Sequence, residues 1–363
     1  MRILVSCIPY DDGKSGISVY TREVVQELVK QGHAITLLLE PGNKSEALGV
    51  TCNAINAPKW TSNALLSMLW HLLFLPFWIL FNRKKFQGMI ICAANRRVCA
   101  FYPLPTIGTV HDLANYHIKG KYSKLRMIYL AWILPFFAKR IKNLVAVSGT
   151  TKTDMIEFWH CSEEQVTVLY NGCSAAPRTR TGSRGSSILY ISRIEHPGKN
   201  HLRLIEAYGC LSHELAGRHP LVLAGADWKD AQIVHEAAEK SPNAEFIHFT
   251  GFVKDIDKLW NEAGFYVFPS LFEGFGLSLL EAMSFGIPCA CSNKGSLKEI
   301  AGDVAITFTP ENSEAIADAL RRLLEESPEE REKRIELGIG HAKRFSWRKH
   351  TEGMLKLLGA DEQ

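Results

Sequence analysis

The stretch from Phe265 to Ser292 restricts the possible fold more than any other part of the chain. It reads FYVFPSLFEGFGLSLLEAMSFGIPCACS. An apolar strand stops at Pro269, a glycine-bearing loop follows, and an apolar helix runs from about Leu277 to Phe285 before a second short strand. A strand that enters a helix N-terminus through glycines is a natural anion site, because unpaired amides and the helix dipole both face the loop.

Two carboxylates belong to this stretch, Glu273 in the loop and Glu281 eight residues later. Carboxylates repel an anion, so they are better suited to bind the hydroxyls of the molecule that carries it. A nucleotide sugar offers both groups: phosphates for the amides and hydroxyls for the carboxylates. An ordinary helix with an acidic first turn explains the same residues equally well.

Strands and helices alternate along the whole chain, which predicts an α/β protein with parallel sheets. Residues 175–187 (AAPRTRTGSRGSS) interrupt the alternation, because they are basic, aperiodic and rich in Pro, Gly and Ser. The alternation restarts at Ile188, so two similar halves should face each other across a cleft. The predicted domains are residues 1–175 and residues 176–345, with a C-terminal helix at 346–363 that packs back on the first domain.

The first half offers two candidate positions at strand ends. The strand Thr106–Val110 ends in His111, and the carboxyl end of a parallel strand points into the crevice where such sheets bind ligands. A capping or core histidine is the alternative. Gly16, in the loop after the first strand, could let a phosphate approach the backbone, or it could belong to an ordinary turn. The neighbouring Gly-Lys-Ser lacks the rest of a P-loop pattern.

Composition predicts a cytoplasmic protein without structural metal. The nine cysteines are scattered and odd in number, which indicates a reducing compartment and no zinc site. The chain opens on a buried strand instead of a secretory signal. Asp255-Ile256-Asp257 resembles a metal-binding D-x-D, but a helix should begin there. We therefore interpret Asp255 as an N-cap and Asp257 as a first-turn acid.

The charge is distributed unevenly between the halves. Residues 1–175 hold 19 Lys and Arg against 11 Asp and Glu, a net charge of +8, whereas the rest hold 23 against 27, a net charge of −4. The first half should therefore face an anionic partner, such as membrane phospholipid or a phosphate-bearing acceptor. Nucleic acid fits the charge, but the sequence contains no nucleic-acid motif.

Residues 64–81 (ALLSMLWHLLFLPFWILF) are the most apolar segment. They are at the low edge of the ~20 residues that a membrane span needs, and they include His71 and Pro76. The basic cluster Arg83-Lys84-Lys85 follows directly. We predict that residues 64–85 form a helix that docks on an anionic membrane surface, which places the protein on the inner face of the cytoplasmic membrane. A helix buried against the sheet is the alternative.

Several motifs together resemble the retaining glycosyltransferases of family 4, which have the GT-B fold of two Rossmann-like domains. Glu273 and Glu281 match the E-x7-E signature of that family, and the match extends over nearly the whole chain. The remaining motifs are Phe268-Pro269-Ser270, Glu273-Gly274-Phe275-Gly276, Leu280-Glu281-Ala282-Met283, Ile191-Ser192-Arg193, Lys199-Asn200-His201, Phe249-Thr250-Gly251-Phe252-Val253, Thr109-Val110-His111-Asp112, Val147-Ser148 and Asn171-Gly172.

The resemblance implies a role for each matching residue. Arg193 and Lys199 would neutralise the diphosphate leaving group. Glu273 would contact the donor sugar, and Glu281 would hold the ribose hydroxyls. His111 would lie near the anomeric carbon. The remaining donor-binding positions are Gly16 on the diphosphate side, Phe252 and Val253 at the base, and the loop Gly274, Phe275, Gly276 and Leu277, whose amides cradle phosphate or sugar.

The chemistry that the resemblance implies is transfer of a hexose from a nucleotide diphosphate sugar to a glycan or a lipid-linked saccharide. GDP-mannose is favoured and a UDP-hexose comes next, because the His-Asp loop and the ending Phe345-Ser346-Trp347 resemble bacterial mannosyl- and rhamnosyltransferases of polysaccharide assembly. Family members retain the anomeric configuration, and we expect neither a metal nor a cofactor. A GT-B nucleotide-sugar epimerase and a non-catalytic nucleotide-sugar-binding protein are the alternatives.

Overall fold

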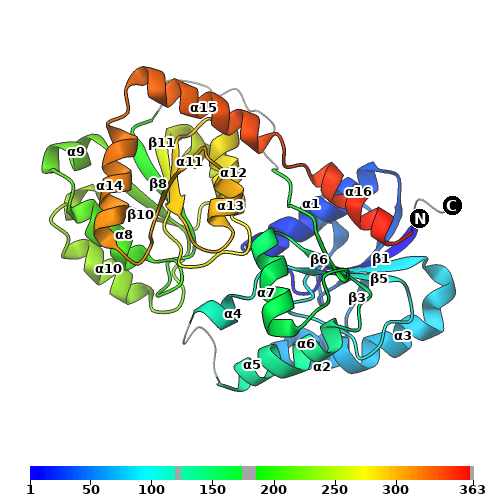
Figure 1. Cartoon of the computed structure of the whole chain (residues 1–363). Helices are drawn as coiled ribbons and strands as arrows, with labels where there is room; N and C mark the ends of the chain where they lie inside the picture. Colours follow the sequence, from blue (N-terminus) through cyan, green and yellow to red (C-terminus); the bar gives the residue numbers. More distant parts are fainter. Residues whose placement is uncertain (119–123, 174–184, 360–363) are drawn as a thin grey trace. The chain divides into compact units, whose positions relative to one another are not determined.

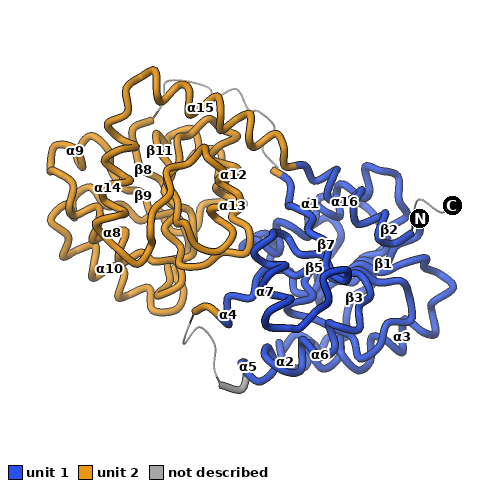
Figure 2. Tube along the Cα trace, in the orientation of Figure 1, with its two compact units in different colours: residues 1–116, 122–172, 346–363 blue, residues 117–121, 173–345 orange. Residues whose placement is uncertain are grey.

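A computed structural model describes residues 1–118, 124–173 and 185–359 (Figure 1). The chain divides into two compact units (Figure 2). The first comprises residues 1–116, 122–172 and 346–363, and the second comprises residues 117–121 and 173–345. The predicted domain boundary at residue 175 and most of the predicted linker lie outside the described residues.

The first unit is built on a seven-stranded sheet with the order β3-β2-β1-β4-β5-β6-β7, and its described strand pairs are parallel. The strands are β1 (Arg2–Ser6), β2 (Ala34–Leu39), β3 (Asn53–Asn56), β4 (Gly88–Ile91), β5 (Thr106–Val110), β6 (Asn143–Ala146) and β7 (Val166–Val168). The helices between them are α1 (Gly16–Lys30), α2 (Ala64–Leu69), α3 (Leu75–Asn82), α4 (Ala114–His117), α5 (Lys124–Ile128), α6 (Leu134–Ala138) and α7 (Gly149–Trp159).

The second unit repeats the architecture with a six-stranded sheet of order β10-β9-β8-β11-β12-β13. Its strands are β8 (Ser187–Ile191), β9 (Leu221–Ala224), β10 (Ile247–Gly251), β11 (Ala263–Phe268), β12 (Cys289–Ser292) and β13 (Ile306–Phe308). Its helices are α8 (His201–Gly209), α9 (His213–Arg218), α10 (Ala231–Glu239), α11 (Ile256–Glu262), α12 (Leu277–Ser284), α13 (Leu297–Ala301), α14 (Ser313–Leu324) and α15 (Pro328–Ala342). Two parallel-sheet Rossmann-like units confirm the predicted fold class.

The stretch on which the sequence analysis opened lies at the middle of the second sheet. Strand β11 is buried along its whole length between β8 and β12, as expected for a strand that is covered on both faces. Helix α12 follows the loop and runs from Leu277 to Ser284, which confirms the predicted strand, loop and helix. The loop is therefore held between a central strand and a packed helix.

Residues 64–85 form a continuous helical stretch, in which the π-helical turn η3 (Trp70–Phe74) separates α2 from α3 and the 3-10 turn η4 (Arg83–Lys85) follows. Within the described residues, this is the helix that is long and apolar enough to cross a membrane by length and composition. Only 39% of its most apolar window is buried. It is therefore not simply a core helix.

Helix α16 (Trp347–Leu357) belongs to the first unit, although the whole second unit separates it in sequence from β7. It packs on α1. The side chain of Gln31, just after α1, donates to the Thr351 hydroxyl at 2.7 Å. Asn143, at the start of β6, donates to the carbonyl of Leu357 at 2.7 Å. These bonds fix the last helix against the sheet of the first unit.

A methyl group at Gly172 should loosen this attachment. A Cβ at Gly172 would overlap the backbone nitrogen and the ring of Trp347. We expect Gly172→Ala to lower the free energy of unfolding by about 1–3 kcal/mol, the usual cost of overpacking. Urea unfolding checks this. Gly340→Ala in α15 is the control, because a Cβ there meets nothing within 4 Å and alanine favours a helix. Equal stability of the two variants would contradict the prediction.

Candidate active site

The carboxyl ends of the central strands of the second sheet bring the predicted donor-binding residues to one edge. Because the strands are parallel, the residues that follow β8, β10 and β11 emerge on the same side. Arg193 follows β8, Phe252 follows β10 and Glu273 follows β11. The alignment of the strands thus gathers residues that are far apart in sequence.

Lys199 and Glu273 form an ion pair at this edge. The Lys199 Nζ atom lies 2.7 Å from Glu273 Oε1, and each side chain is about one-fifth exposed, 21% for the lysine and 18% for the glutamate. Burial opposes the charged ammonium, but the neighbouring Glu273 carboxylate outweighs it and raises the pKa of Lys199. The site therefore holds a fixed positive charge with a carboxylate beside it.

The loops that carry this pair are bonded to each other. The Leu271 amide donates to the Gly198 carbonyl at 3.0 Å. The buried Asn200 side chain donates to the carbonyl of Pro269 at 3.0 Å and to that of Pro310 at 2.7 Å. The Tyr190 hydroxyl donates to the Lys199 carbonyl at 2.9 Å. The lysine backbone is therefore fixed before any ligand arrives.

Ser296 holds the loop that contains Glu273. Its amide and hydroxyl contact the Glu273 carbonyl at 3.1 and 3.0 Å, and its hydroxyl also lies 3.0 Å from the Phe275 carbonyl. Gly295 passes so close that an added Cβ would lie 2.7 Å from the Glu273 carbonyl oxygen. Gly276 has a φ of +101°, which glycine adopts readily, and it is the N-cap of α12.

Helix α12 begins at Leu277, directly after this loop, so its N-terminal amides and the positive end of its dipole face the loop side. Phe275 is buried and Glu281 is half-buried. The predicted loop Gly274 to Leu277 therefore lies at a helix N-terminus, and Glu281 lies one turn into that helix.

Arg193 lies beside two residues that the sequence analysis did not consider. Its guanidinium is 3.3 Å from the Glu195 carboxylate and 5.1 Å from the centre of the Trp228 ring. Trp228 follows β9, the strand between β8 and β10, and its side chain is exposed. The sequence signal that could have identified Trp228 is an aromatic residue three positions after Gly225, where the strand has just ended.

Phe252 and Val253 follow β10 at the same edge, and Phe252 is largely exposed. Gly251 precedes them with a φ of +65°, which turns the chain out of the strand. The Gly225 amide donates to the Gly251 carbonyl at 3.0 Å. An exposed aromatic ring on a fixed turn can stack on a flat ligand.

His111 lies at the carboxyl end of β5 in the first unit and is buried. Its Nε2 is 2.7 Å from the Cys92 carbonyl oxygen, so Nε2 carries a proton and Nδ1 keeps its lone pair in the neutral ring. Burial lowers the pKa of His111 to about 4. The ring is therefore a neutral, oriented imidazole near pH 7.

A second histidine supports this region from helix α16. His350 Nδ1 lies 3.0 Å from the Tyr170 carbonyl, so this nitrogen donates and Nε2 accepts from the Tyr20 hydroxyl at 2.8 Å. The Tyr20 hydroxyl then accepts from Thr109, also at 2.8 Å. The Tyr20 ring packs edge-on against His111, with 4.6 Å between the ring centroids. Tyr20 thus links α16 to the candidate catalytic histidine.

Gly16 lies at a different kind of position from the one predicted. The sequence predicts that Gly16 lies in the loop after the first strand, but α1 begins at Gly16 itself. The reason is Ser15, whose side chain accepts from the Ser18 amide and caps the helix. Gly16 is therefore an exposed first-turn residue with its amide at a helix N-terminus.

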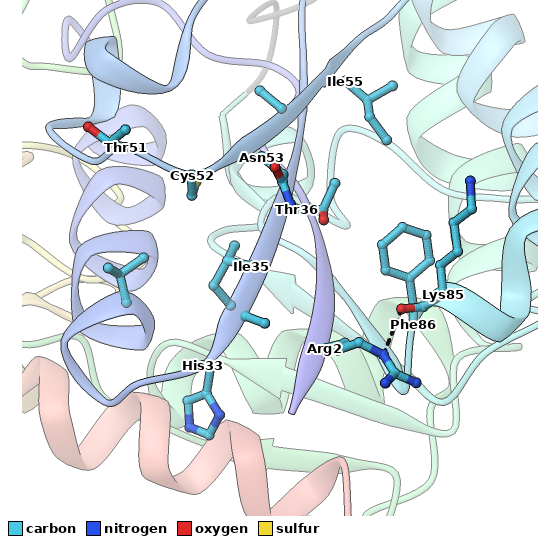
Figure 3. A pocket seen from close by; sticks show the side chains of 13 residues that line it. Arg2, His33, Ile35, Thr36, Thr51, Cys52, Asn53, Ile55, Lys85 and Phe86 are labelled. Atoms are coloured by element: carbon cyan, nitrogen blue, oxygen red, sulfur yellow. Dashed lines mark hydrogen bonds between the residues drawn. The ribbon is translucent and has the colours of Figure 1, made fainter.

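A hollow of about 950 Å³ in the first unit is lined by none of these residues (Figure 3). It is lined by Arg2, Ala34 and Asn53, the first residues of β1, β2 and β3, and by Lys85, whose carbonyl accepts from Arg2 Nε at 3.0 Å. It therefore lies at the amino ends of the strands, the opposite edge from His111. Parallel sheets bind ligands at the carboxyl edge, so we do not assign the donor to this hollow.

The D-x-D segment lies at the start of α11, as interpreted from sequence. Asp255 occupies the N-cap position but its side chain makes no capping hydrogen bond, and Asp257 lies in the first turn. Over residues 1–118, 124–173 and 185–359, no cluster of three or more His, Cys, Asp or Glu has the geometry to hold a metal ion.

Two sequence models of glycosyltransferase families match the chain. "Glycosyltransferase Family 4" matches residues 14–176, and "Glycosyl transferases group 1" matches residues 179–340. The O-antigen chain mannosyltransferase B of Escherichia coli is 30% identical over 260 residues, which covers 68% of each chain. The chain belongs to the family 4 glycosyltransferases, and its two Rossmann-like units are the GT-B fold of that family.

Further relatives agree with the family assignment, and solved structures agree with the fold. The chain is 29% identical over 285 residues to the serotype-specific mannosyltransferase WbdA of Escherichia coli, which covers 72% of this chain but only 34% of that protein. The Anabaena protein HepE, solved with UDP and glucose, superimposes with a TM-score of 0.75 at 18% identity over 99% of both chains. WaaG, a glycosyltransferase involved in lipopolysaccharide biosynthesis, gives 0.73 at 15% identity over 99% of both chains.

The buried imidazoles make the stability of the first unit depend on pH. Burial lowers the pKa of His350 to about 4, as it does for His111, whereas in the unfolded chain a histidine titrates near 6.5. The unfolded chain therefore binds more protons between these values, and the free energy of unfolding should fall as the pH drops from about 6.5 to about 4. Urea unfolding at pH 7.5 and pH 5 measures the effect.

His350→Gln should make this pH dependence shallower, because glutamine does not titrate. His160→Asn is the matched control, since His160 is exposed and has a left-handed backbone that asparagine tolerates. An unchanged slope in His350→Gln would show that this histidine does not contribute.

Proposed function

We propose that the chain is a retaining, metal-independent hexosyltransferase of polysaccharide or lipopolysaccharide assembly. It moves a hexose from a nucleotide diphosphate sugar to a glycan or a polyprenyl-diphosphate-linked saccharide and uses no cofactor. GDP-mannose is the favoured donor, supported by the mannosyltransferase names of its relatives, and a UDP-hexose comes next because HepE was solved with UDP and glucose.

The observation that carries this proposal is the ion pair between Lys199 and Glu273 at the strand edge. A diphosphate needs a fixed positive charge, and a hexose needs a carboxylate that accepts from its hydroxyls. The pair offers both within 2.7 Å. In our proposal, Lys199 and the more exposed Arg193 neutralise the diphosphate, while the Glu273 carboxylate accepts hydrogen bonds from the sugar hydroxyls.

The remaining residues bind the rest of the donor. The amides of Gly274 to Leu277 bind phosphate or sugar, because they lie at the N-terminus of α12. Glu281 accepts from the ribose hydroxyls, and the base lies against Phe252 and Val253. Gly16 contributes its helix-terminal amide on the diphosphate side. His111 orients the sugar near its anomeric carbon as a neutral imidazole.

The proposed transfer occurs on the face from which the leaving group departs. The bond between the anomeric carbon and the phosphate oxygen breaks, and the acceptor oxygen bonds to the same face of that carbon. The proton of the acceptor hydroxyl passes to the departing phosphate. No protein nucleophile is needed, so Glu273 and Glu281 do not have to act as the carboxylate pair of a retaining glycosidase.

We propose that the enzyme works at the inner face of the cytoplasmic membrane and docks through residues 64–85. The support is the large exposed apolar fraction of this helix and the basic turn Arg83–Lys85 at its end. A peripheral position would bring the enzyme to a lipid-linked acceptor.

Separating stability from activity tests the site. We expect Lys199→Ala to lower kcat/KM by about 100-fold or more, the usual effect of losing one electrostatic contact to a developing charge. It should also reduce stability, because Glu273 is left half-buried without its partner. Lys199→Ala/Glu273→Ala should recover stability but not activity. Transfer assays and urea unfolding measure the two effects.

Lys258→Ala is the control, because its ion pair with Glu262 is solvent-exposed and belongs to α11. Near-normal transfer by Lys199→Ala would refute the site. Thermal-shift measurements with GDP-mannose, UDP-glucose and dTDP-sugars identify the donor, because a ligand that binds the native state raises its melting temperature. Activity should persist in EDTA, and loss in EDTA that Mg²⁺ restores would refute metal independence.

A further inference from the structure

Two helical segments of the first unit repeat each other at an offset of 59 residues. In the first, the π-helical turn Trp70–Phe74 is followed by Leu75-Pro76-Phe77-Trp78. In the second, the π-helical turn η5 (Tyr129–Ile133) is followed by Leu134-Pro135-Phe136-Phe137. Both segments end in basic residues, Arg83 to Lys85 in the first and Lys139 and Arg140 in the second.

The repeat extends to which side chains are buried. Leu75 and Leu134 are fully buried at equivalent positions. Phe77 and Phe136 are equivalent, and they are 54% and 56% exposed. The other equivalent exposed pairs are Leu69 with Ile128, Leu73 with Trp132, and Phe74 with Ile133. Each segment therefore presents an apolar face to the outside and packs the opposite face on the sheet.

The prolines explain the shared π-helical turns. A proline has no N–H, so Pro76 leaves the carbonyl of Leu72 without its helical partner. The Ala100 amide donates a hydrogen bond to this carbonyl instead, at 2.9 Å. In both segments the amide before the proline bonds five residues back, Leu75 to Trp70 and Leu134 to Tyr129.

The loop at Ala100 joins the two segments. The Ala100 amide donates to the Leu72 carbonyl, and the Ala100 carbonyl accepts from Arg140 Nη1 at 2.9 Å. Phe101 packs edge-on against Phe77 at 5.1 Å, and the Tyr102 hydroxyl donates to the Phe137 carbonyl at 3.2 Å. Figure 1 shows α2, α3, α5 and α6 along the same side of the first unit. The two apolar faces thus belong to one surface.

This surface lies in a segment that almost lacks negative charge. Residues 47–153 contain 14 lysines and arginines and a single acidic residue, Asp112. The basic ends of both segments are exposed, and the Arg140 guanidinium lies 4.4 Å from the centre of the Phe136 ring. Aromatic side chains with cations at their border match the interface of a bilayer whose headgroups are negative.

We propose that residues 64–85 and 126–140 form a two-helix platform that inserts into the surface of an anionic lipid bilayer. This extends the docking of residues 64–85 proposed above, because half of the platform comes from the second segment. Leu75, Ile79 and His71 pack into the first unit, and His71 Nε2 lies 2.9 Å from the Ser6 hydroxyl. A bilayer span would break these contacts, so the segments lie along the surface.

Vesicle binding by the full chain tests the platform. Trp132→Ser/Phe136→Ser should weaken binding to vesicles of phosphatidylethanolamine with 30% phosphatidylglycerol by at least about tenfold. This is the loss expected when an aromatic side chain no longer inserts into the apolar part of the bilayer. Phe77→Ser/Phe81→Ser should weaken it similarly. Leu337→Ser is the control, because Leu337 is about as exposed as Phe77 and Phe136 but lies on α15 of the second unit. Wild-type protein should bind vesicles of phosphatidylcholine alone at least about tenfold less well.

The outcomes separate this proposal from the alternatives. Loss with the Phe77/Phe81 variant alone would leave a single docking helix and overturn the platform. Unchanged vesicle binding in both variants, with a dimer that these substitutions dissociate, would assign the surface to self-association instead. Donor-induced thermal shifts should be the same in all variants. If vesicle binding behaves as expected and no nucleotide sugar shifts the melting temperature, the proposed function fails and the platform stands.

Discussion

The ion pair between Lys199 and Glu273 is the interaction on which the candidate active site depends. A lysine that is only one-fifth exposed needs a partner, because removing an ammonium from water is costly. Its partner comes from a loop 74 residues away. The sheet makes this meeting possible, since β8 and β11 are neighbours and parallel, and their following loops begin at the same edge. The hydroxyls of Tyr190 and Ser296 donate to the carbonyls of Lys199 and Glu273 and so fix the two loops.

Much of this arrangement could be predicted from local sequence. The apolar strand before Pro269 and the glycines around Glu273 predicted a strand, a turn and a helix, and the structure has all three. These features depend on neighbouring residues, which a sequence displays directly. The family membership followed from the same motifs, because their spacing is set by the turn that they form.

Other features depend on residues that are distant in sequence, and they could not be predicted. The contact of Tyr20 with His350 joins positions 330 residues apart. Trp228 lies beside Arg193 only because β9 is adjacent to β8. The start of α1 was a different kind of error, since the capping serine at position 15 was present in the sequence but was assigned to the loop. The 59-residue repeat went unrecognised because its two copies share a burial pattern more than they share residues.

The attachment of α16 has a consequence for how the chain acquires its structure during synthesis. Domains generally fold in order from the N-terminus as the ribosome makes them. The first unit departs from this order, since Tyr20 and Gly172 reach their neighbours only when Trp347 and His350 have been added. Until then the unit exposes the surface of α1 that α16 will cover. The first unit therefore stays incomplete while the whole second unit is translated. During that interval its exposed α1 surface is a binding site for chaperones.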